Sequence, residues 1–221
     1  MKTTLLTLVS LLILFALHSC SQNGAHWESL FGEDYALAEY EDGSWEVKDD
    51  AIVAYEDMAL WAKGEYENFR LEFEFMNEAG TNSGIIVYCT NKADWIPNSV
   101  EIQIADDHGE KWGEARKDYQ CGAIFGHLPA NEQKVVKEPG EWNTMAISCE
   151  GQLIEVVLNG KKVTSMDMTQ WTSGTINPDG SEIPSWLPTP FAEIPTKGSI
   201  GFQGKHGESS ISFRNVRIKS L

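Results

Sequence analysis

Side chains that could bind a polar ligand and act on it lie on two stretches of alternating sequence. In residues 100–104 (Val-Glu-Ile-Gln-Ile) and 200–203 (Ile-Gly-Phe-Gln), polar or small residues alternate with apolar ones, as in strands with one buried face. Glu101 and Gln103 then project from the same face, roughly 7 Å apart. If both strands share a sheet, with open space at Gly201, a carboxylate and the amides of Gln103 and Gln203 meet beside a cavity. Such groups pair well with vicinal hydroxyls, so a sugar-binding floor and a row of solvated side chains are the two open interpretations.

Two histidines follow these strands and are candidates for acid–base or metal chemistry. His206 lies in a Gly-flanked turn three residues beyond Gln203. A histidine in such a turn is usually structural, but a place at the mouth of the cleft makes it a candidate for proton transfer. Asp106, Asp107 and His108 follow the other strand and could form a metal site, a proton relay or an acidic turn, and the turn is the default. No His-x-x-x-His spacing accompanies them, so zinc is not indicated.

Tryptophans are the second group of candidate binding residues. An exposed indole beside a cleft can stack on the apolar face of a sugar ring, although packing in the core or a loop is the default for any single one. The candidates are Trp61, Trp95, Trp112, Trp142, Trp171 and Trp186. The chain has no Gly-x-Ser-x-Gly, Walker loop or Gly-x-Gly-x-x-Gly, so elbow-type hydrolases and nucleotide enzymes receive no support.

Period-two alternation dominates the elements that must position these residues. Further strands are expected at 69–75, 84–89, 144–149, 153–158 and 211–218, with a bulge near Asn215 and a hairpin turn at Asn159-Gly160. Helical periodicity is confined to Lys111–Lys117 and Met166–Trp171. Many short strands and few helices predict an all-β antiparallel sandwich or jelly roll. The proline-rich segment Thr172–Lys197 is expected to be a lid, a wall of a site or a disordered excursion.

The N-terminal residues are typical of a targeting signal. Lys2 precedes a short apolar run, and the run ends in Leu17-His18-Ser19-Cys20, which resembles a bacterial lipobox. We expect residues 1–19 to be a lipoprotein signal peptide, Cys20 to be acylated, 20–26 to be a short tether and 27–221 to be a single domain. An ordinary secretory peptide is the alternative. Either way the protein is expected to be exported, and with the lipid it is anchored in the cell envelope, in the periplasm or at the surface.

Charge and cysteine usage exclude several classes of function. The chain has 33 acidic and 17 basic residues, a formal charge of −16, which argues against binding to nucleic acid or to anionic lipid through the protein surface. The membrane is therefore a partner only through the N-terminal anchor. No Cys-x-x-Cys spacing occurs. Cys89 and Cys149 are expected to be buried apolar residues, and pairing among these and Cys121 stays open.

Nine ordered blocks of sequence resemble one family. They include Leu60-Trp61-Ala62-Lys63, Asn82-Ser83-Gly84-Ile85, residues 100–104, Pro139-Gly140-Glu141-Trp142-Asn143 and residues 200–207. Together they resemble the 3-keto-disaccharide hydrolase family, also described as 3-keto-glucoside 1,2-lyases and 3-keto-2-hydroxy-glucal hydratases, over about Trp27 to Leu221. The resemblance implies a concanavalin A-like jelly roll of two antiparallel sheets, whose concave face binds an oxidised (3-keto) glycoside or disaccharide.

The resemblance also implies a mechanism. A ketone at C3 acidifies the proton on C2, a base removes it, the C1 substituent leaves, and water adds to the glucal. Glu101 and His206 are the candidate acid–base pair, with either assignment open. Gln103, Gln203, Asn82 and Lys63 are candidates for binding the substrate or stabilising the oxyanion.

Further candidates for contact with substrate are Trp61, Asp106, His108 and Tyr88. Many relatives carry Arg where Tyr88 stands. No cofactor is certain, although a divalent ion held by Glu101, His206 or Asp106 could supply the electrophile.

Two other classes stay open at this point. Residues 101–106 look like a degraded Glu-x-Asp-x-x-Glu strand of jelly-roll β-glucanases, with Gln103 in place of the central acid, so a two-carboxylate glycosidase is incomplete. A non-catalytic carbohydrate-binding module would use the same sheet and tryptophans. The fold alone cannot separate these classes.

Overall fold

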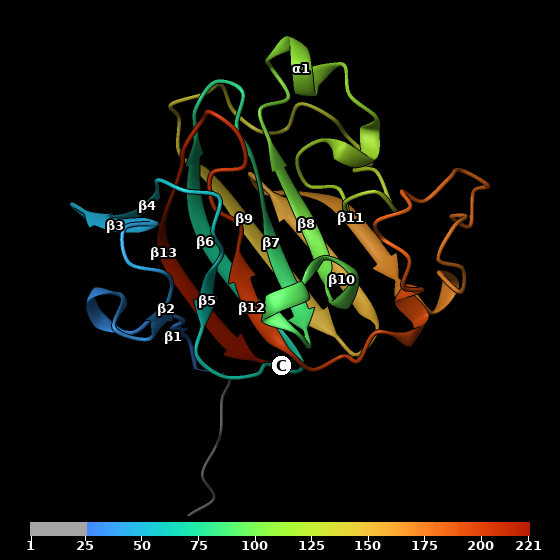
Figure 1. Cartoon of the computed structure of the whole chain (residues 1–221), viewed down its shortest axis with the longest axis horizontal. Coiled ribbons are helices and arrows are strands. Elements are labelled where there is room, and N and C mark those ends of the chain that lie inside the picture. The colour runs from blue at the N-terminus through green and yellow to red at the C-terminus, as the bar shows by residue number, and fades with distance from the viewer. Residues whose placement is uncertain (1–25) are drawn as a thin grey trace, which may run out of the picture.

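Two antiparallel sheets packed face to face form the protein, and the computed structural model describes residues 26–221 (Figure 1). The predicted signal peptide and the candidate lipidation site at Cys20 lie outside the described residues. Within residues 26–221, no helix combines the length and the apolar character needed to cross a membrane.

The larger sheet has eight strands. Its main path runs through β11 (Lys161–Asp167), β10 (Leu153–Leu158), β9 (Asn143–Glu150), β6 (Phe69–Asn77), β13 (Ile211–Ser220), β4 (Ala51–Ala54) and β3 (Trp45–Lys48), and β1 (Glu28–Ser29) pairs with β13. The second sheet runs through β2 (Ala38–Glu39), β5 (Leu60–Ala62), β12 (Ser199–Phe202), β7 (Asn82–Cys89) and β8 (Val100–Ala105).

Helical structure is restricted to single turns in the connections. The only α-helix of the described residues is α1 (Glu110–Gly113). The 3-10 turns are η1 (Glu33–Tyr35), η2 (Lys92–Asp94), η3 (Ile96–Asn98), η4 (Lys117–Tyr119), η5 (Met168–Gln170) and η6 (Phe191–Glu193). The two predicted helices are therefore shorter than expected, because neither segment extends its periodicity over the 12 or so residues that a stable helix needs.

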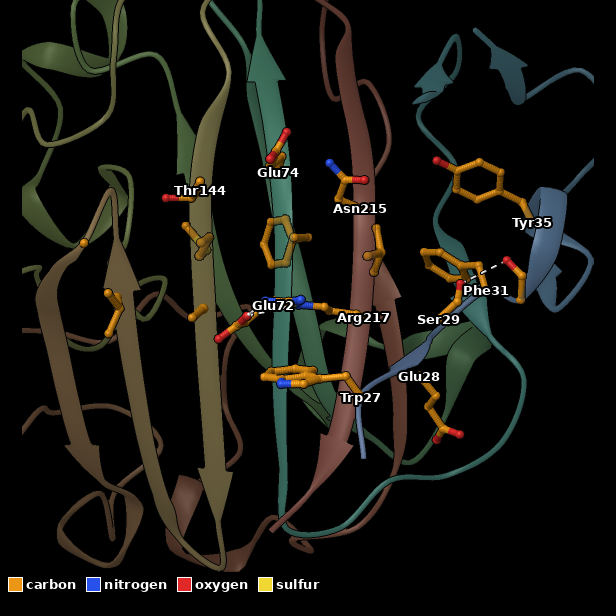
Figure 2. Close-up of a pocket in the computed structure, with 17 residues that line it drawn as sticks. Trp27, Glu28, Ser29, Phe31, Tyr35, Glu72, Glu74, Thr144, Asn215 and Arg217 are labelled. Carbon is orange, nitrogen blue, oxygen red and sulfur yellow. Dashed lines mark hydrogen bonds and ion pairs between the residues drawn. The ribbon is translucent and has the colours of Figure 1, made fainter. Parts of the chain in front are cut away.

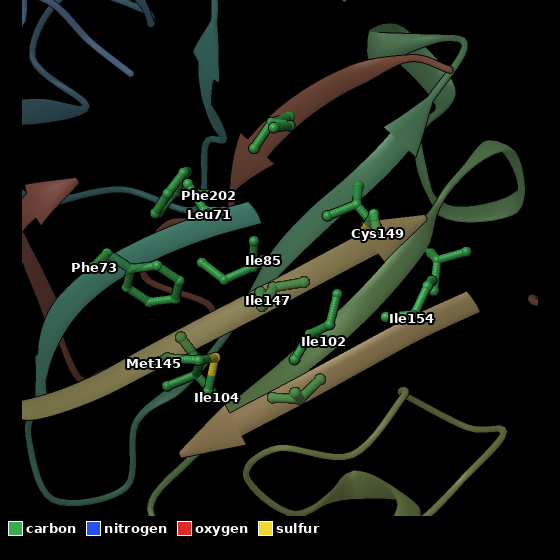
Figure 3. Packing of buried hydrophobic residues seen from close by; sticks show 14 of the residues in the cluster. Leu71, Phe73, Ile85, Ile102, Ile104, Met145, Ile147, Cys149, Ile154 and Phe202 are labelled. Carbon is green, nitrogen blue, oxygen red and sulfur yellow. The ribbon is translucent and has the colours of Figure 1, made fainter. Parts of the chain in front are cut away.

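The core lies between the sheets and follows from the alternation of the strands (Figure 3). Along β6, Phe69, Leu71, Phe73 and Phe75 are buried while the intervening charged residues are half-buried. Burying each such side chain contributes about 1.5–3 kcal/mol. The all-β jelly-roll prediction is confirmed.

Local predictions about turns and cysteines also hold. The pairing of β13 with β6 shifts register between Arg214 and Arg217, where Asn215 has a φ of 53°. Asn159 and Gly160, with φ of 49° and 81°, form the tight turn between β10 and β11, as a hairpin with the right-handed twist requires. Cys89 and Cys149 are free and buried, like Cys121.

Candidate functional site

A pocket of about 300 Å³ opens on the face of the five-stranded sheet that points away from the core. Its polar lining residues come from the strands and the turn after β12: Asn82, Glu101, Gln103, Gln203 and His206. Its walls come from connections between strands: Trp95, Ile96, Trp112, Tyr119, Phe125 and Trp186. The polar floor predicted from the alternating sequence is thus brought together in one place.

Strand register explains how the floor forms. β12 pairs with β7, and β7 pairs with β8, so the strands carrying Gln203 and Glu101 share a sheet. Gly84 of β7 lies opposite Gln103 of β8. The backbone N–H of Gln203 donates to the Gly84 carbonyl at 2.8 Å. A Cβ atom at Gly84 would collide with Oε1 of Glu101. Glycine at this position therefore creates the space in which the Glu101 carboxyl group sits.

The side-chain amides of the floor can hydrogen-bond a ligand that carries hydroxyl groups. The Gln103 side chain donates from Nε2 to Oδ1 of Asn82 at 2.7 Å. Oε1 of Gln203 is buried and has no hydrogen-bond partner among the described residues. Leaving such an atom unpaired costs about 1–3 kcal/mol, and a ligand hydroxyl would remove that cost.

Glu101 is the one acidic residue that lines this pocket. Its carboxyl group makes no hydrogen bond or ion pair within residues 26–221, and burial raises its pKa from 4.5 to about 8. Desolvation disfavours the charged form of a carboxyl group when no cation or N–H donor compensates. Glu101 is therefore largely protonated at neutral pH and has a proton to donate, as a carboxyl group with a raised pKa does in acid–base enzymes.

A second carboxylate holds the histidine of the pocket. His206 Nδ1 lies 2.7 Å from Oδ2 of Asp57, which comes from the connection between β4 and β5. When Nδ1–H donates to Asp57, Nε2 carries the lone pair of the neutral ring. Both side chains are more than half exposed, at 56% and 54%. Asp57 could not be predicted from the sequence, because nothing in the acidic loop around Asp57 marks this residue as the partner of the distant His206.

Three of the six candidate tryptophans line the pocket. Trp95 comes from the β7–β8 connection, Trp112 from α1 in the β8–β9 connection, and Trp186 from the proline-rich segment between β11 and β12. Tyr119 and Phe125 complete the lining, with ring centroids 4.7 Å apart. The proline-rich segment therefore forms a wall of the site, one of its three expected roles.

Tyr88 is not a substrate contact, and that prediction was wrong. Its φ is 57°, so the side chain does not follow the alternation of β7 and turns into the core instead. It is fully buried, its ring packs edge-on against Phe69, and its hydroxyl donates to the Gly151 carbonyl at 2.6 Å.

Trp61 and Lys63 also lie outside the pocket lining. The Trp61 ring fills the space expected to be open above Gly201, where a Cβ atom would lie 2.6 Å from Cζ3 of the indole. Trp61 is only 9% exposed and packs against Ile86. Lys63 is exposed, with Nζ 3.4 Å from the Ala36 carbonyl. The prediction of open space at Gly201 was wrong, because the indole fills it.

Asp106 and His108 organise a turn rather than the site. Asp106 is 2% exposed and accepts hydrogen bonds from the backbone N–H groups of Gly80, His108 and Gly109 at 2.8, 3.1 and 3.2 Å. The His108 ring lies with Nε2 2.9 Å from the Val136 carbonyl. The default interpretation of residues 106–108 as an acidic turn is confirmed, and neither side chain reaches the pocket lining.

The candidate metal ligands do not form a set. Glu101 and His206 line the pocket, but the Asp106 carboxylate is already engaged by backbone N–H groups elsewhere. No group of three or more His, Cys, Asp or Glu side chains in the described part of the chain is arranged to hold a metal ion. The residues present therefore do not fit a resident divalent ion.

A larger hollow of about 900 Å³ lies over the eight-stranded sheet, and three of its four charged lining residues are held in ion pairs (Figure 2). Glu72 lies 2.7 Å from Arg217, and Glu74 lies 2.6 Å from Arg214. The Arg217 guanidinium also stacks on Trp27 at 4.6 Å from the ring centroid. The fourth charged residue, Glu28, is exposed to solvent and not enclosed by the hollow, so the smaller pocket, whose carboxyl group is desolvated, is the candidate site.

Two stacked antiparallel sheets, with an amide-lined floor and aromatic walls around one protonated carboxyl group, define a jelly-roll protein of the carbohydrate-active class. The chain belongs to the 3-keto-α-glucoside 1,2-lyase-like family, whose domain matches residues 26–219. The resemblance seen in the sequence is confirmed.

Solved structures agree with this membership. A candidate glycosyl hydrolase from Parabacteroides distasonis is 61% identical, with a TM-score of 0.87 over 89% of this chain and 100% of that chain. Another from the same organism is 25% identical, with a TM-score of 0.71 over 88% and 94%. A carbohydrate-binding module from Bacillus subtilis, 12% identical with a TM-score of 0.53 over 83% and 96%, shares the fold alone. No functionally curated protein matches the chain.

Proposed function

We propose that the protein cleaves the glycosidic bond of 3-keto-glycosides by removing the C2 proton, eliminating the C1 substituent and hydrating the product. Family membership supports this reaction. The observation that carries it is the pairing, in one pocket, of a protonated carboxyl group at Glu101 with a histidine oriented by Asp57. An elimination needs a base for one carbon and an acid for the leaving oxygen.

The geometry favours one assignment of the two roles. Nε2 of His206 takes the C2 proton, because Asp57 accepts the hydrogen bond from Nδ1 and leaves Nε2 unprotonated. The electron pair of the C2–H bond first forms the enolate, with negative charge on the C3 oxygen. The enolate then restores the C3 carbonyl and forms the C1=C2 bond as the C1–O bond breaks, and Glu101 protonates the departing oxygen. In the second half, the Glu101 carboxylate takes a proton from water as oxygen adds to C1, and the imidazolium returns a proton to C2. Both groups end as they began.

The amides of the floor would bind the sugar and stabilise charge on the C3 oxygen. Asn82 accepts the Gln103 bond through Oδ1, which leaves its own N–H₂ group free to donate. Negative charge that develops on the C3 oxygen in the enolate is best stabilised by such fixed donors. The unpaired Oε1 of Gln203 suits a sugar hydroxyl.

A conventional glycosidase is less well supported. Retaining and inverting enzymes flank the scissile bond with two carboxyl groups, whereas Glu101 is the one acid lining this pocket. A non-catalytic binding module would use the same floor and walls, and it differs from an enzyme only in turnover.

The test is incubation of purified protein with 3-keto-trehalose and, separately, with trehalose, each with and without a chelator. We expect glucose to be released from 3-keto-trehalose and not from trehalose, with or without the chelator. In D₂O the 3-keto-glucose product should carry one deuterium at C2. Cleavage of trehalose would favour an ordinary glycosidase, and binding without turnover would favour a binding module. Glu101→Gln and His206→Ala should abolish turnover, whereas His108→Gln, outside the pocket, is the matched control.

Export and lipid anchoring at Cys20 in the bacterial cell envelope are part of this proposal. They are supported by the apolar run and the Leu-x-Ser-Cys ending of residues 17–20. Labelled palmitate should enter the full-length chain in cells and should not enter Cys20→Ala. Labelling that survives this substitution would contradict the anchor.

A further inference from the structure

The walls of the pocket differ chemically from its floor. The floor carries a carboxyl group, three amides and an imidazole, whereas only three of the six wall side chains have a polar group left to hydrogen-bond a ligand. Ile96 and Phe125 have none, and the indole N–H of Trp112 is already donated to the Gly80 carbonyl at 3.0 Å. The Tyr119 hydroxyl and the indole N–H groups of Trp95 and Trp186 are what remain.

Two wall side chains stay exposed although both are large and apolar. Trp186 is 55% exposed and Ile96 is 43% exposed. Trp186 is held in place, because Pro184 and Leu187 on either side of it are buried, and the Leu187 N–H donates to the Pro184 carbonyl at 2.9 Å. Both residues pack on Gly126, where a Cβ atom would lie 2.6 Å from Leu187 Cδ1. The chain therefore presents an apolar surface at the mouth on an anchored segment.

From this contrast we infer that the leaving group is a planar aromatic alcohol, so that the preferred substrates are aryl 3-keto-glycosides held by Trp186 and Ile96. This inference rests on the proposed function and deepens it. A second sugar would carry hydroxyls against walls that offer few partners for them, and unpaired polar groups are costly to bury. An aromatic ring meets no such cost and gains from stacking on the indole. An isoleucine side chain adds apolar contact to a flat ring but accepts no hydrogen bond from a hydroxyl.

The volume fits the same conclusion. A pocket of about 300 Å³ lies at the lower end of the range for small-molecule sites. It suits one sugar ring over the polar floor and one further ring against the walls, rather than an oligosaccharide.

The experiment compares phenyl 3-keto-α-glucoside with 3-keto-trehalose in the wild type and in Trp186→Ala. The two substrates share the reacting sugar and differ in the leaving group. For each substrate the ratio of kcat/KM between wild type and variant removes the intrinsic reactivity of the leaving group from the comparison. Trp186→Ala should lower kcat/KM about tenfold for the phenyl substrate, mainly by raising KM, and less than about threefold for 3-keto-trehalose. Trp186→Phe should restore most of the loss. Trp142→Ala, whose indole stacks on Arg214 away from the pocket, is the matched control.

The outcomes separate this inference from the proposed function. Equal losses on both substrates would overturn the aromatic preference and leave the elimination reaction standing. If the wild type turns over neither ketone, the proposed function falls, and titration with phenyl α-glucoside by indole fluorescence decides the inference. Binding that weakens in Trp186→Ala would support an aryl site, and binding that is absent or unchanged would overturn it.

Discussion

Replacing Glu101 with glutamine should make the protein more stable while it loses its activity. Burial raises the pKa of this carboxyl group from 4.5 to about 8. The folded state therefore holds the proton that the unfolded chain gives up, and the contribution of this one group to stability is most favourable below pH 4.5 and becomes less favourable as the pH rises from there through 8. Glutamine keeps the shape of the side chain and has no charge to desolvate.

The size of the effect follows from the shift. At about 1.4 kcal/mol for each pKa unit, the raised pKa of Glu101 lowers the free energy of unfolding by at most about 3 kcal/mol at pH 7 and by about 5 kcal/mol above pH 8. Glu101→Gln should remove these costs, so its gain over the wild type should be near zero at pH 4 and grow between pH 5 and 8. The activity of the wild type should fall above pH 8, as the proton donor ionises.

Urea unfolding of the wild type and Glu101→Gln at pH 4, 7 and 9 measures this difference directly. The control is Glu39→Gln, since the hydrogen bond from the half-buried Lys92 lowers the pKa of the exposed Glu39. The stabilisation that Glu39 gains from Lys92 is present above pH 4.5 and is lost as the pH falls. Glu39→Gln should therefore destabilise the protein slightly at pH 7 and not at acid pH. A difference between wild type and Glu101→Gln that does not change with pH would refute the reasoning.

Three further substitutions test the surroundings of the site. Gly84→Ala places a methyl group against the carboxyl of Glu101, so kcat should drop while the circular dichroism spectrum is unchanged; full activity would show that the carboxyl can move freely. Asp57→Asn should lower kcat by up to about 10⁴-fold with little change in KM, because His206 loses the partner that fixes its tautomer. The ¹⁵N shifts of the ring should report a mixture of tautomers, and an unaltered spectrum would remove Asp57 from this role. Burial raises the pKa of Asp107 to about 6, so Asp107→Asn should raise the thermal midpoint at pH 8 and have little effect at pH 4; equal midpoints at pH 8 would contradict it.

The alternation of polar and apolar residues was enough to predict most of the polar floor. Glu101, Gln103 and Gln203 lie where it put them, since side chains of a strand alternate between its faces. Tyr88 breaks the rule, because a positive φ reverses its direction, and this is invisible in a sequence rich in β-formers. The prediction at Gly201 failed for a different reason. Glycine suggested an empty space there, but the indole of Trp61 on the neighbouring strand fills it.

Other parts of the site depend on contacts between distant segments. Asp57 and His206 are 149 residues apart, and no local pattern connects them. Trp95, Trp112 and Trp186 could be named as candidates for stacking, but their meeting in one pocket depends on how three connections fold over the sheet. Local sequence predicts which face a strand residue takes, and it does not predict where a long connection comes to rest.

The division of the pocket between sheet and connections has a consequence for how such a protein can evolve or be redesigned. The proposed acid–base groups lie on a paired strand and the short turn after β12, while each tryptophan of the walls lies on a separate connection. Exchanging one connection would therefore alter which molecules are accepted without moving the groups that transfer protons. Libraries that vary residues 95–96, 112 and 186 one connection at a time should yield enzymes with new leaving-group preferences at nearly constant chemistry on the sugar.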